Sequence, residues 1–523
     1  MSWRSTRASG QEGYLNRQVA VVDLGSNSWR LVVFTYGTPP HPWWKLTDEL
    51  YETVRIGAGL AATGRLSYEG IGRGLETLSV FARFCRANHI PPEDVYVVAT
   101  SAIRDATNGE QFLGDAQRAT GLTIETLSAP DEAFFGYVAA VNTTTLQDGV
   151  VLDIGGGSLQ LTRVEDRHHR EMTSFPLGAV RLTEQFLPGD GPVKKKELGR
   201  LRSHVKDALS DVSWLASSGH RLVGVGGAVR NLAAAAQAAD GVIDLGVQGF
   251  VIKPAVLSGL VSQLAALPVD ERGAMPGVKP GRGDIILAAA VVLDVVVSQG
   301  GFDGIEATEA GLREGVFLAR TLLDEAEPLV PDVRADAVRN LAIQYESDIP
   351  HVEHVARLAL QMFDSLADTG LITPRAGERE LLWAASMLHD VGMTISYGDH
   401  HKHSRYLIES AELYGFRPRE RALIAQMTRY HRKGIPKLGA IEGLAGEGDE
   451  ELLERCSMIL RLAEHLERGR DQAVSEVRLD TNGDGIDLHL KAAGDLTLPR
   501  WSVERYGDGD AFERVFERRL LIG

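Results

Sequence analysis

Cysteine and long apolar runs are both scarce in this chain of 523 residues. The two cysteines, Cys85 and Cys456, lie far apart, which excludes a disulfide framework and is typical of a reducing cytoplasm. The longest apolar run, residues 285–297, contains Asp294 and is too short to span a bilayer. No apolar stretch follows the first arginines, so residues 1–17 are predicted to be a short polar leader rather than a secretory signal. These features predict a cytoplasmic protein with no membrane partner.

Positive charge is scarce as well. The chain has 55 lysines and arginines against 71 acidic residues, which gives a formal net charge of -16. Proteins that coat nucleic acid are usually basic, so we expect no nucleic-acid partner. An anionic ligand would need a local basic patch or a metal ion. Apolar residues (44%) and charged residues (24%) stand at ordinary globular levels, which excludes disorder as the main architecture.

The order of strand and helix patterns divides the chain. Strands and helices alternate in the first half, where an apolar strand followed by a glycine turn occurs three times. Two of these turns share one order of residue types, which indicates an internal repeat and two related α/β halves. The predicted domains are residues 18–142, 143–325, an all-helical 326–471 and a small α+β 472–523. Six helices are expected in the helical domain, at residues 336–345, 352–368, 378–388, 403–414, 418–430 and 450–468.

The two similar turns are candidates for phosphate binding. They read Asp23-Leu24-Gly25-Ser26-Asn27-Ser28 and Asp153-Ile154-Gly155-Gly156-Gly157-Ser158. Glycine lets backbone amides turn toward a ligand, and hydroxyl and amide side chains add donors. Asp23 and Asp153, at the strand ends, are candidate ligands of Mg²⁺, directly or through water. One such loop alone would be an ordinary strand turn, whereas two alike favour a clamp for phosphate oxygens.

Two charged residues near expected strand ends allow two interpretations each. Arg104 either binds phosphate through its planar guanidinium or forms a surface salt bridge. Glu132 either activates water as a general base or is an ordinary acidic residue in the first turn of a helix. The chain has no Walker A lysine motif and no Gly-x-Ser-x-Gly elbow, which excludes a P-loop enzyme and argues against a serine hydrolase.

Metal-binding residue types gather in the predicted helical domain. His354 lies on one expected helix, and His389-Asp390 ends another. Four more histidines follow, at His400, His401, His403 and His431. This is the spacing of HD-type metal sites, and imidazole with carboxylate suits a divalent transition metal. We therefore predict a second divalent metal at His354, His389 and Asp390, with structural histidines as the alternative.

Basic residues are concentrated in the same region, at Lys402, Arg405, Arg429, Arg432 and Lys433. In a chain of net charge -16, a local basic strip suggests a channel for an anionic substrate. A solvated helix face is the alternative.

An ordered set of sequence blocks resembles the exopolyphosphatase and guanosine pentaphosphate phosphohydrolase family. The blocks in the first half are VAVVDLGSNSWRLVVF, VVATSAIRDATNG, LSAPDEAFFGYVAAV, VVLDIGGGSLQLTRVE, FPLGAVRLTEQF, LVGVGGAVRNLAA and TEAGLREGVF. Downstream stand LLWAASMLHDVGMTISYGDHHKHSRYLIES and MTRYHRKGIP. The match covers nearly the whole chain in the family's order.

The resemblance implies a two-lobed α/β fold of the sugar kinase, actin and chaperone ATPase type, which is ribonuclease H-like, with the active site in the cleft. An HD-like helical domain and a small α+β domain follow. It also implies a homodimer and stepwise hydrolysis of terminal phosphate from inorganic polyphosphate with Mg²⁺. The alternative substrate is guanosine pentaphosphate, which would lose its 5′ γ-phosphate.

The resemblance also assigns roles to single residues. Glu132 matches the family's catalytic base, and Asp153 its metal-associated carboxylate. The family's phosphate-binding positions correspond to Ser26, Asn27, Ser28, Arg104 and Gly155. Gly156, Gly157 and Ser158 are predicted to bind phosphate as the rest of the second glycine loop. Two positions depart from the family: Gln160 stands where glutamate is usual, and Glu464 stands where an HD site has its last aspartate. A neutral Gln160 near the metal is expected to change metal affinity or rate, and a polyphosphate or nucleotide sensor without catalysis stays open as an alternative.

Overall fold

The computed structural model describes residues 16–38, 42–241, 245–323, 326–483, 485–507 and 509–522. The chain separates into two compact units. Unit 1 comprises Met1–Ser128 and Val316–Glu325, and unit 2 comprises Ala129–Gly315 and Ala326–Gly523. The predicted leader lies outside the described residues except for its last two. Among the described residues, no helix has both the length and the apolar character needed to cross a membrane.

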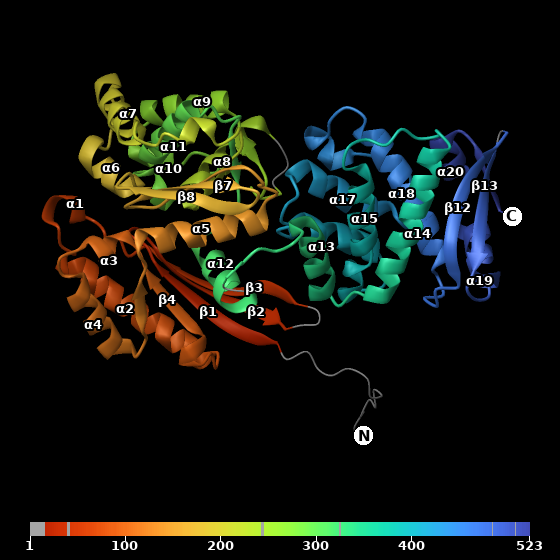
Figure 1. The fold of residues 1–523 in the computed structure, drawn as a ribbon, viewed down its shortest axis with the longest axis horizontal. Helices are drawn as coiled ribbons and strands as arrows, with labels where there is room; N and C mark the ends of the chain where they lie inside the picture. Colours follow the sequence, from red (N-terminus) through yellow and green to blue (C-terminus); the bar gives the residue numbers. More distant parts are fainter. Residues whose placement is uncertain are drawn as a thin grey trace. The chain divides into compact units, whose positions relative to one another are not determined.

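Unit 1 is built on a five-stranded sheet, drawn in red and orange in Figure 1, with the strand order β3-β2-β1-β4-β5. The strands are β1 (Arg17–Leu24), β2 (Trp29–Gly37), β3 (Trp43–Glu52), β4 (Val95–Ala99) and β5 (Ile124–Thr126). β1, β2 and β3 pair antiparallel, whereas β4 and β5 join β1 in parallel. Parallel pairing needs crossover connections, and the helices α2 (Tyr68–Ala87), α3 (Ser101–Asp105) and α4 (Gly109–Thr120) lie in them.

A late segment of the chain completes unit 1. Residues 316–325 belong to unit 1, although almost two hundred residues of unit 2 separate them from Ser128. Phe317 stacks on Phe34 of β2, with ring centroids 4.3 Å apart, and contacts Trp44 of β3. The burial of this aromatic cluster holds the segment on the sheet.

Unit 2 contains a second sheet with the order β10-β11-β9-β6-β7-β8. Its strands are β6 (Gly149–Ile154), β7 (Leu159–Glu165), β8 (His168–Phe175), β9 (Leu222–Val225), β10 (Val251–Ile252) and β11 (Ile305–Ala307). The run β8-β7-β6-β9-β11 repeats the plan of unit 1, with three antiparallel strands followed by two parallel ones. The predicted internal repeat and the two-lobed, actin-like α/β fold are thereby confirmed.

Helices cover this second sheet. They are α5 (Ala129–Thr143), α6 (Ala179–Phe186), α7 (Lys195–Leu209), α8 (Gly227–Asp240), α9 (Pro254–Ala266) and α11 (Ile286–Gly300). α5 packs against β6, β7 and β8, so it belongs to unit 2, whereas the sequence placed it before a boundary at residue 142. The long apolar run forms α11, a core helix. Its buried Asp294 carboxylate accepts a 2.6 Å hydrogen bond from Ser258 Oγ on α9.

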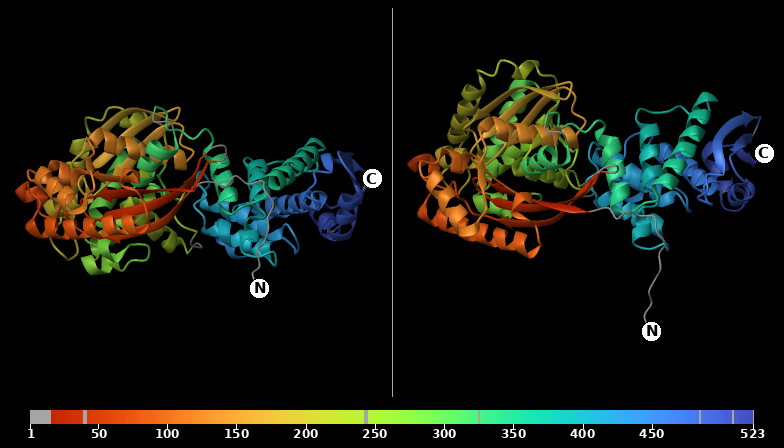
Figure 2. Two further views of the ribbon diagram at one scale, coloured as in Figure 1. Left: turned by 90° about the horizontal axis from the view of Figure 1, so that it is seen from below. Right: turned by 60° about the horizontal axis from the view of Figure 1, so that its bottom comes forward.

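The rest of unit 2 is helical and then α+β, as predicted. The helices are α13 (Val333–Gln344), α14 (Ile349–Asp368), α15 (Glu378–Leu388), α16 (His400–Ser410), α17 (Pro418–Tyr430) and α18 (Asp449–Leu466). Figure 2 shows the final sheet in blue near the C-terminus, with β12 (Val474–Asn482), β13 (Gly485–Ala492) and β14 (Arg519–Ile522) beside α19 (Thr497–Tyr506) and α20 (Gly509–Phe516). The bounds of α15 and α17 agree with the prediction, whereas α16 begins three residues before the expected 403.

Short elements complete the described chain. They are α1 (Leu60–Thr63), α10 (Val269–Gly273), α12 (Leu312–Phe317), η1 (Pro92–Asp94), η2 (Leu215–Ser217), η3 (Pro280–Arg282), η4 (Leu318–Leu322), η5 (Val391–Thr394) and η6 (Gly439–Leu444).

Candidate functional site

The second glycine loop connects β6 to β7 in unit 2. The amide of Gly155 donates to the carbonyl oxygen of Ser158 at 3.0 Å and closes the turn. The start of α6 packs so tightly on this loop that a Cβ at Gly178 would lie 2.3 Å from backbone atoms of Gly157. Only glycine at position 178 permits this contact between two backbones.

The contact with α6 engages the carbonyl oxygens of the loop and leaves two of its backbone amides without an acceptor. Amides at the start of α6 donate to the carbonyl oxygens of Gly155 and Gly156 at 2.9 Å, and Arg181 Nε donates to that of Gly157 at 3.1 Å. Among the described residues, the amides of Gly156 and Gly157 donate no hydrogen bond. A half-buried loop with engaged carbonyls and unengaged amides suits an anion.

A buried chain of hydrogen bonds joins this loop to Glu132. Glu132 lies in the first turn of α5 and is 7% exposed. Gln160 Nε2 donates to Ser158 Oγ at 2.9 Å, and Ser158 Oγ donates to Glu132 Oε1 at 3.4 Å. The structure thus brings together three residues that the sequence singled out separately. The hydroxyl of Ser158 orients a carboxylate that can accept a proton.

Asp153 lies at the end of β6, directly opposite Gln160 in the pairing with β7. Two glycines keep the space around its carboxylate open. A Cβ at Gly226 would lie 3.1 Å from Asp153 Oδ1, and one at Gly136 would lie 3.4 Å from Oδ2. Gly226 has a φ of 101°, which other residues rarely adopt. A half-buried carboxylate at the end of a strand suits a hard cation such as Mg²⁺.

The first glycine loop connects β1 to β2 in unit 1 and repeats this arrangement of hydrogen bonds. Its carbonyl oxygens are also engaged from outside the loop. Gly25 accepts from Trp29 Nε1 at 3.0 Å, and the amides of Gly57 and Arg55 donate to Ser26 and Asn27 at 2.9 and 2.8 Å. Residues 55–57 follow β3, and sequence reasoning missed their part in the loop because β3 itself was not predicted.

Side chains of the first loop also offer donors. Ser26 Oγ lies 3.2 Å from Ser101 Oγ at the start of α3. Within the described residues, the buried Nδ2 of Asn27 has no hydrogen-bond partner. Buried donors are normally paired, and a bound anion would provide the missing acceptor. Ser28 precedes β2, and Asp23 lies at the end of β1, opposite Arg30.

Arg104 lies on α3, as its predicted place after β4 requires. Its Nη1 donates to the carbonyl oxygen of Leu127 at 2.9 Å, and its Nε lies 3.5 Å from Asp105. The guanidinium is therefore oriented within unit 1. A common phosphate site for the two loops involves both units and stays a prediction, as do the roles of the single residues.

The basic strip lies on α16 and around the end of α17. Lys402 Nζ and Lys433 Nζ lie 2.8 and 3.9 Å from Asp399, and Arg432 lies over the ring of Tyr397, 5.4 Å from its centroid.

The other two members of the strip have partners of their own. Arg405 Nε donates to Glu409 at 2.7 Å, and Arg429 lies over Tyr430. Burial, together with Arg429 and Arg432, lowers the pKa of His401 to about 4. The strip therefore borders the histidines, and its role as a substrate channel stays a prediction.

The histidines gather in one buried cluster with two carboxylates. Six residues from five helical elements contribute: His351, His389, Asp390, His400, His431 and Glu464. Two triads of possible metal ligands share Asp390, one with His351 and His389 and one with His400 and His431. The position predicted for His354 is therefore taken by His351, one helical turn earlier.

His354 points elsewhere. Its Nε2 lies 2.9 Å from the carbonyl oxygen of Val474 on β12, and its Nδ1 lies 2.8 Å from Arg357. Burial and Arg357 lower its pKa, so it is a neutral residue at the contact with the C-terminal sheet.

Charge is concentrated in the cluster. Burial alone would lower the pKa of His389, but Asp390 and Glu464 outweigh burial and raise the pKa to about 9. Burial opposes the ionisation of both carboxyls, yet the histidines hold the pKa of Asp390 and of Glu464 well below the usual range. Glu464, which stands at the position expected for an aspartate, lies 3.2 Å from both His351 Nε2 and His389 Nε2.

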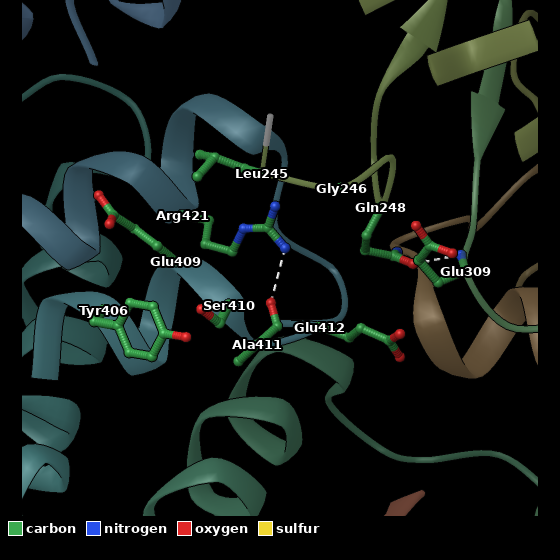
Figure 3. A pocket seen from close by; sticks show the side chains of 10 residues that line it. All are labelled: Leu245, Gly246, Gln248, Glu309, Tyr406, Glu409, Ser410, Ala411, Glu412 and Arg421. Carbon is green, nitrogen blue, oxygen red and sulfur yellow. Dashed lines mark hydrogen bonds between the residues drawn. The ribbon is translucent and has the colours of Figure 1, made fainter. Parts of the chain in front are cut away.

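A separate pocket of about 500 Å³ in unit 2 has an acidic lining (Figure 3). Glu309, Glu409 and Glu412 line it together with Arg421, whose Nη1 donates to the carbonyl oxygen of Ala411 at 2.8 Å. Burial raises the pKa of Glu412. Three carboxyls against one guanidinium disfavour a phosphate chain, so the glycine loops remain the better candidates.

Comparison with known proteins agrees with this arrangement. Residues 45–324 match the Ppx/GppA phosphatase family, and residues 333–498 match domain III of that family. One curated relative, "Guanosine-5'-triphosphate,3'-diphosphate pyrophosphatase" of Vibrio vulnificus, is 29% identical over 481 residues, which cover 90% of this chain and 92% of the relative. The protein of the same name from Vibrio atlanticus is 28% identical over 503 residues, with 93% and 95% covered.

Solved structures show the same relationship. A Ppx/GppA family member from Aquifex aeolicus has a TM-score of 0.50 and 27% identity, and the match covers 59% of this chain and 98% of the Aquifex chain. An exopolyphosphatase from Cytophaga hutchinsonii has a TM-score of 0.53 at 22% identity, covers 58% of this chain and 97% of its own, and supports the fold alone. Because the first family match spans more than half of the sequence, this chain belongs to the Ppx/GppA phosphatase family.

Proposed function

We propose that the chain hydrolyses the terminal phosphoanhydride bond of an anionic phosphate chain, with guanosine pentaphosphate as the substrate favoured over inorganic polyphosphate. The hydrogen-bonded chain Gln160–Ser158–Glu132 beside the unengaged amides of Gly156 and Gly157 carries the proposal. It places a buried carboxylate next to a loop suited to phosphate, as hydrolysis by activated water requires.

The choice of substrate rests on the curated relatives. The two Vibrio relatives described above align over at least nine-tenths of this chain, and both bear the name of the guanosine pentaphosphate enzyme. This reverses the order expected from the sequence, where polyphosphate came first. Polyphosphate remains the second candidate because the basic strip on α16 and α17 suits a longer anion.

In the proposed reaction, the amides of Gly156 and Gly157 bind oxygens of the terminal phosphate. Glu132 orients a water molecule and accepts its proton as the water attacks the phosphorus in line with the leaving phosphate. The transition state is loose, so positioning and charge stabilisation supply most of the rate. Asp153 would hold Mg²⁺, which neutralises phosphate charge when bound, and Asp23 is the corresponding candidate in unit 1. Arg104, Asn27 and the hydroxyls of the first loop would bind further phosphate oxygens.

Two parts of the proposal rest on the family resemblance and the composition. These are assembly as a homodimer and a cytoplasmic location. Light scattering on the purified chain would test the first, and fractionation of the source cells the second.

Replacing the proposed base tests the mechanism. Glu132→Gln keeps the size of the side chain but cannot accept the proton, so we expect phosphate release to fall by about 10² to 10⁴ while substrate still binds. Asp131→Asn is the matched control, since Asp131 is the exposed neighbour on the same turn. The measurement is phosphate release with Mg²⁺ from guanosine pentaphosphate and long-chain polyphosphate in parallel.

Each outcome has a clear meaning. Full activity of Glu132→Gln would remove Glu132 as the base. Faster release from polyphosphate than from the nucleotide would restore the first-expected substrate. If the wild-type protein binds either ligand but releases no phosphate, the sensor function is favoured. Gln160 would then be the first residue to test as the cause of the lost catalysis.

A further inference from the structure

We propose that the buried cluster on α14 to α18 is a two-metal centre for divalent transition ions, with Asp390 as the carboxylate shared by both ions. This site is separate from the proposed phosphohydrolase site and does not depend on it. Nothing in the family match assigns ions to these six residues.

The spacing of the donor atoms is that of a coordination sphere. For one ion, His351 Nε2 and His389 Nε2 each lie 3.2 Å from Glu464 Oε2, and 3.9 and 3.6 Å from oxygens of Asp390. Ligands bound about 2.0–2.2 Å from a common ion lie about 3 Å or slightly more from one another. The four donors therefore need only small movements to hold an ion.

The second set of donors is tighter still. His400 Nε2 lies 3.2 Å from Asp390 Oδ1 and 3.0 Å from His431 Nε2. Asp390 contacts both sets, because its Oδ1 lies near both His400 and His389 while its Oδ2 is the atom near His351. A carboxylate between two ions is the usual arrangement in two-metal sites.

Hydrogen bonds on the outer side of the rings set their orientation. The Nδ1 atoms of His389, His400 and His431 lie 2.6, 3.0 and 2.7 Å from backbone carbonyl oxygens. A carbonyl oxygen only accepts, so each Nδ1 carries the proton and each Nε2 presents its lone pair to the cluster when the ring is neutral. In two neutral rings the lone pairs of His400 and His431 then face each other at 3.0 Å, which is repulsive unless one ring gains a proton or a metal ion lies between them and Asp390.

His351 supplies an independent observation. Its side chain is 2% exposed, and among the described residues neither ring nitrogen makes a well-aligned hydrogen bond, although Nε2 lies 3.2 Å from Glu464 Oε2. Burying a polar nitrogen without a well-aligned partner is costly. A metal ion bound to Nε2, which points at Glu464 and Asp390, would satisfy that nitrogen.

The backbone is shaped to bring α16 to the cluster. A Cβ at Gly392 would lie 2.3 Å from the carbonyl oxygen of His400 and 2.4 Å from the amide of Ser404. Ser404 Oγ donates to the carbonyl oxygen of His389 at 2.6 Å and accepts from the amide of Gly392 at 2.9 Å. These contacts fix the position of His400 on α16 relative to His389 and Asp390.

The donor set also selects the ion. Four imidazoles and two carboxylates suit Mn²⁺, Fe²⁺, Co²⁺, Ni²⁺ or Zn²⁺ rather than Mg²⁺ or Ca²⁺, which prefer oxygen. The positive charge of two divalent ions exceeds the negative charge of the two carboxylates, Asp390 and Glu464. Arg470, 2.7 Å from Asp390 Oδ2, and Arg468, 3.5 Å from Glu464 Oε1, add to the excess. An anion such as phosphate would therefore complete the centre.

Metal content tests the proposal directly. The full-length protein is stripped with a chelator, loaded with Mn²⁺ or Co²⁺ and desalted, and the metal is counted by mass spectrometry. We expect about two ions per chain in the wild type, one in His351→Gln and one in His431→Gln. His354→Gln is the matched control on the same helix as His351, and it should keep both ions.

A spectroscopic measurement on the wild type keeps the test decisive if variants unfold. Two Mn²⁺ ions that share Asp390 should give an exchange-coupled electron paramagnetic resonance signal, and two Co²⁺ ions should show visible absorption from nitrogen ligation. One ion per chain, an uncoupled signal, or no retained ion would overturn the two-metal centre. Equal losses of metal in His354→Gln and His351→Gln would overturn the assignment of ligands.

Discussion

At the scale of single residues, Gln160 sets how much negative charge would face the Mg²⁺ ion proposed to lie beside Asp153. The two residues lie opposite each other on β6 and β7. Gln160→Glu adds a second carboxylate there, so the Mg²⁺ concentration for half-maximal activity should fall several-fold. A glutamate cannot donate to Ser158 as Gln160 Nε2 does, so the maximal rate should change as well.

A Mg²⁺ titration of phosphate release measures both effects. Gln147→Glu adds the same charge at an exposed position away from the loop and serves as the control. If both variants have the Mg²⁺ dependence of the wild type, the cation does not lie beside Asp153.

Asp336 on α13 makes the stability of unit 2 depend on pH. Burial raises the pKa of this carboxyl from 3.8 to about 6. The folded state then holds a proton that the unfolded state has lost between these two values, so stability falls as pH rises through this window. Asp336→Asn removes the penalty and should raise the free energy of unfolding by about 1–3 kcal/mol at pH 8.

Thermal denaturation between pH 4 and pH 8 checks this. The gain should vanish near pH 4, where both forms of the protein carry an uncharged side chain at this position. Asp368→Asn, at an exposed position on α14, should show no such trend. A gain that is equal at pH 4 and pH 8 would show that the carboxyl titrates normally.

At the scale of secondary-structure elements, the contact between α6 and the second glycine loop controls the candidate site. A Cβ at Gly178 would lie 2.3–2.4 Å from backbone atoms of Gly156 and Gly157. Gly178→Ala must therefore displace the loop, and we expect a loss of about 1–3 kcal/mol in stability with at least about tenfold lower turnover.

A second glycine provides the comparison. A Cβ at Gly199, inside α7, meets nothing within 4 Å. Gly199→Ala should raise stability by about 0.5–1 kcal/mol and leave turnover unchanged. Denaturant unfolding and phosphate release on both variants distinguish a displaced loop from a general effect of alanine. An active Gly178→Ala protein would mean that the loop geometry is not critical.

The helices and strands differ in how well their bounds could be predicted from the sequence. The amphipathic helices α15 and α17 have the predicted bounds, because their apolar residues repeat with the helix period. The edge strand β3 was missed, since seven of its ten residues are exposed and show no alternation. Its backbone is held by pairing with β2, which no local pattern reports.

At the scale of the whole molecule, residues 316–325 limit where the chain can be divided. The solved Aquifex relative aligns over 98% of its length with 59% of this chain, so a shortened protein is expected to fold, and under the proposed function it should release phosphate. A chain ending at Pro331 keeps Phe317 on the sheet of unit 1 and also the hydrogen bonds of Asn142 to residues 328 and 330. We expect it to fold and to act on guanosine pentaphosphate.

A chain ending at Gly315 is the matched comparison. It lacks Phe317, whose stacking on Phe34 is part of a buried aromatic cluster, so unit 1 should lose about 3–5 kcal/mol or fail to fold. Thermal denaturation and phosphate release on both shortened chains decide the matter. If the chain ending at Pro331 folds but releases no phosphate, the helical region takes part in the reaction.

The sequence alone determined the two α/β halves and both glycine loops, because strand ends, turns and glycine positions are local features that a short stretch of chain expresses. It also singled out His389-Asp390 as candidate metal ligands. Tertiary structure decided which histidine lies beside that pair. His351 and His354 are three residues apart and lie on neighbouring turns of one helix face, so their spacing does not separate them. The packing of α14 against α18 brings His351 to Glu464, while β12 supplies a carbonyl oxygen to His354, and these partners lie more than a hundred residues away.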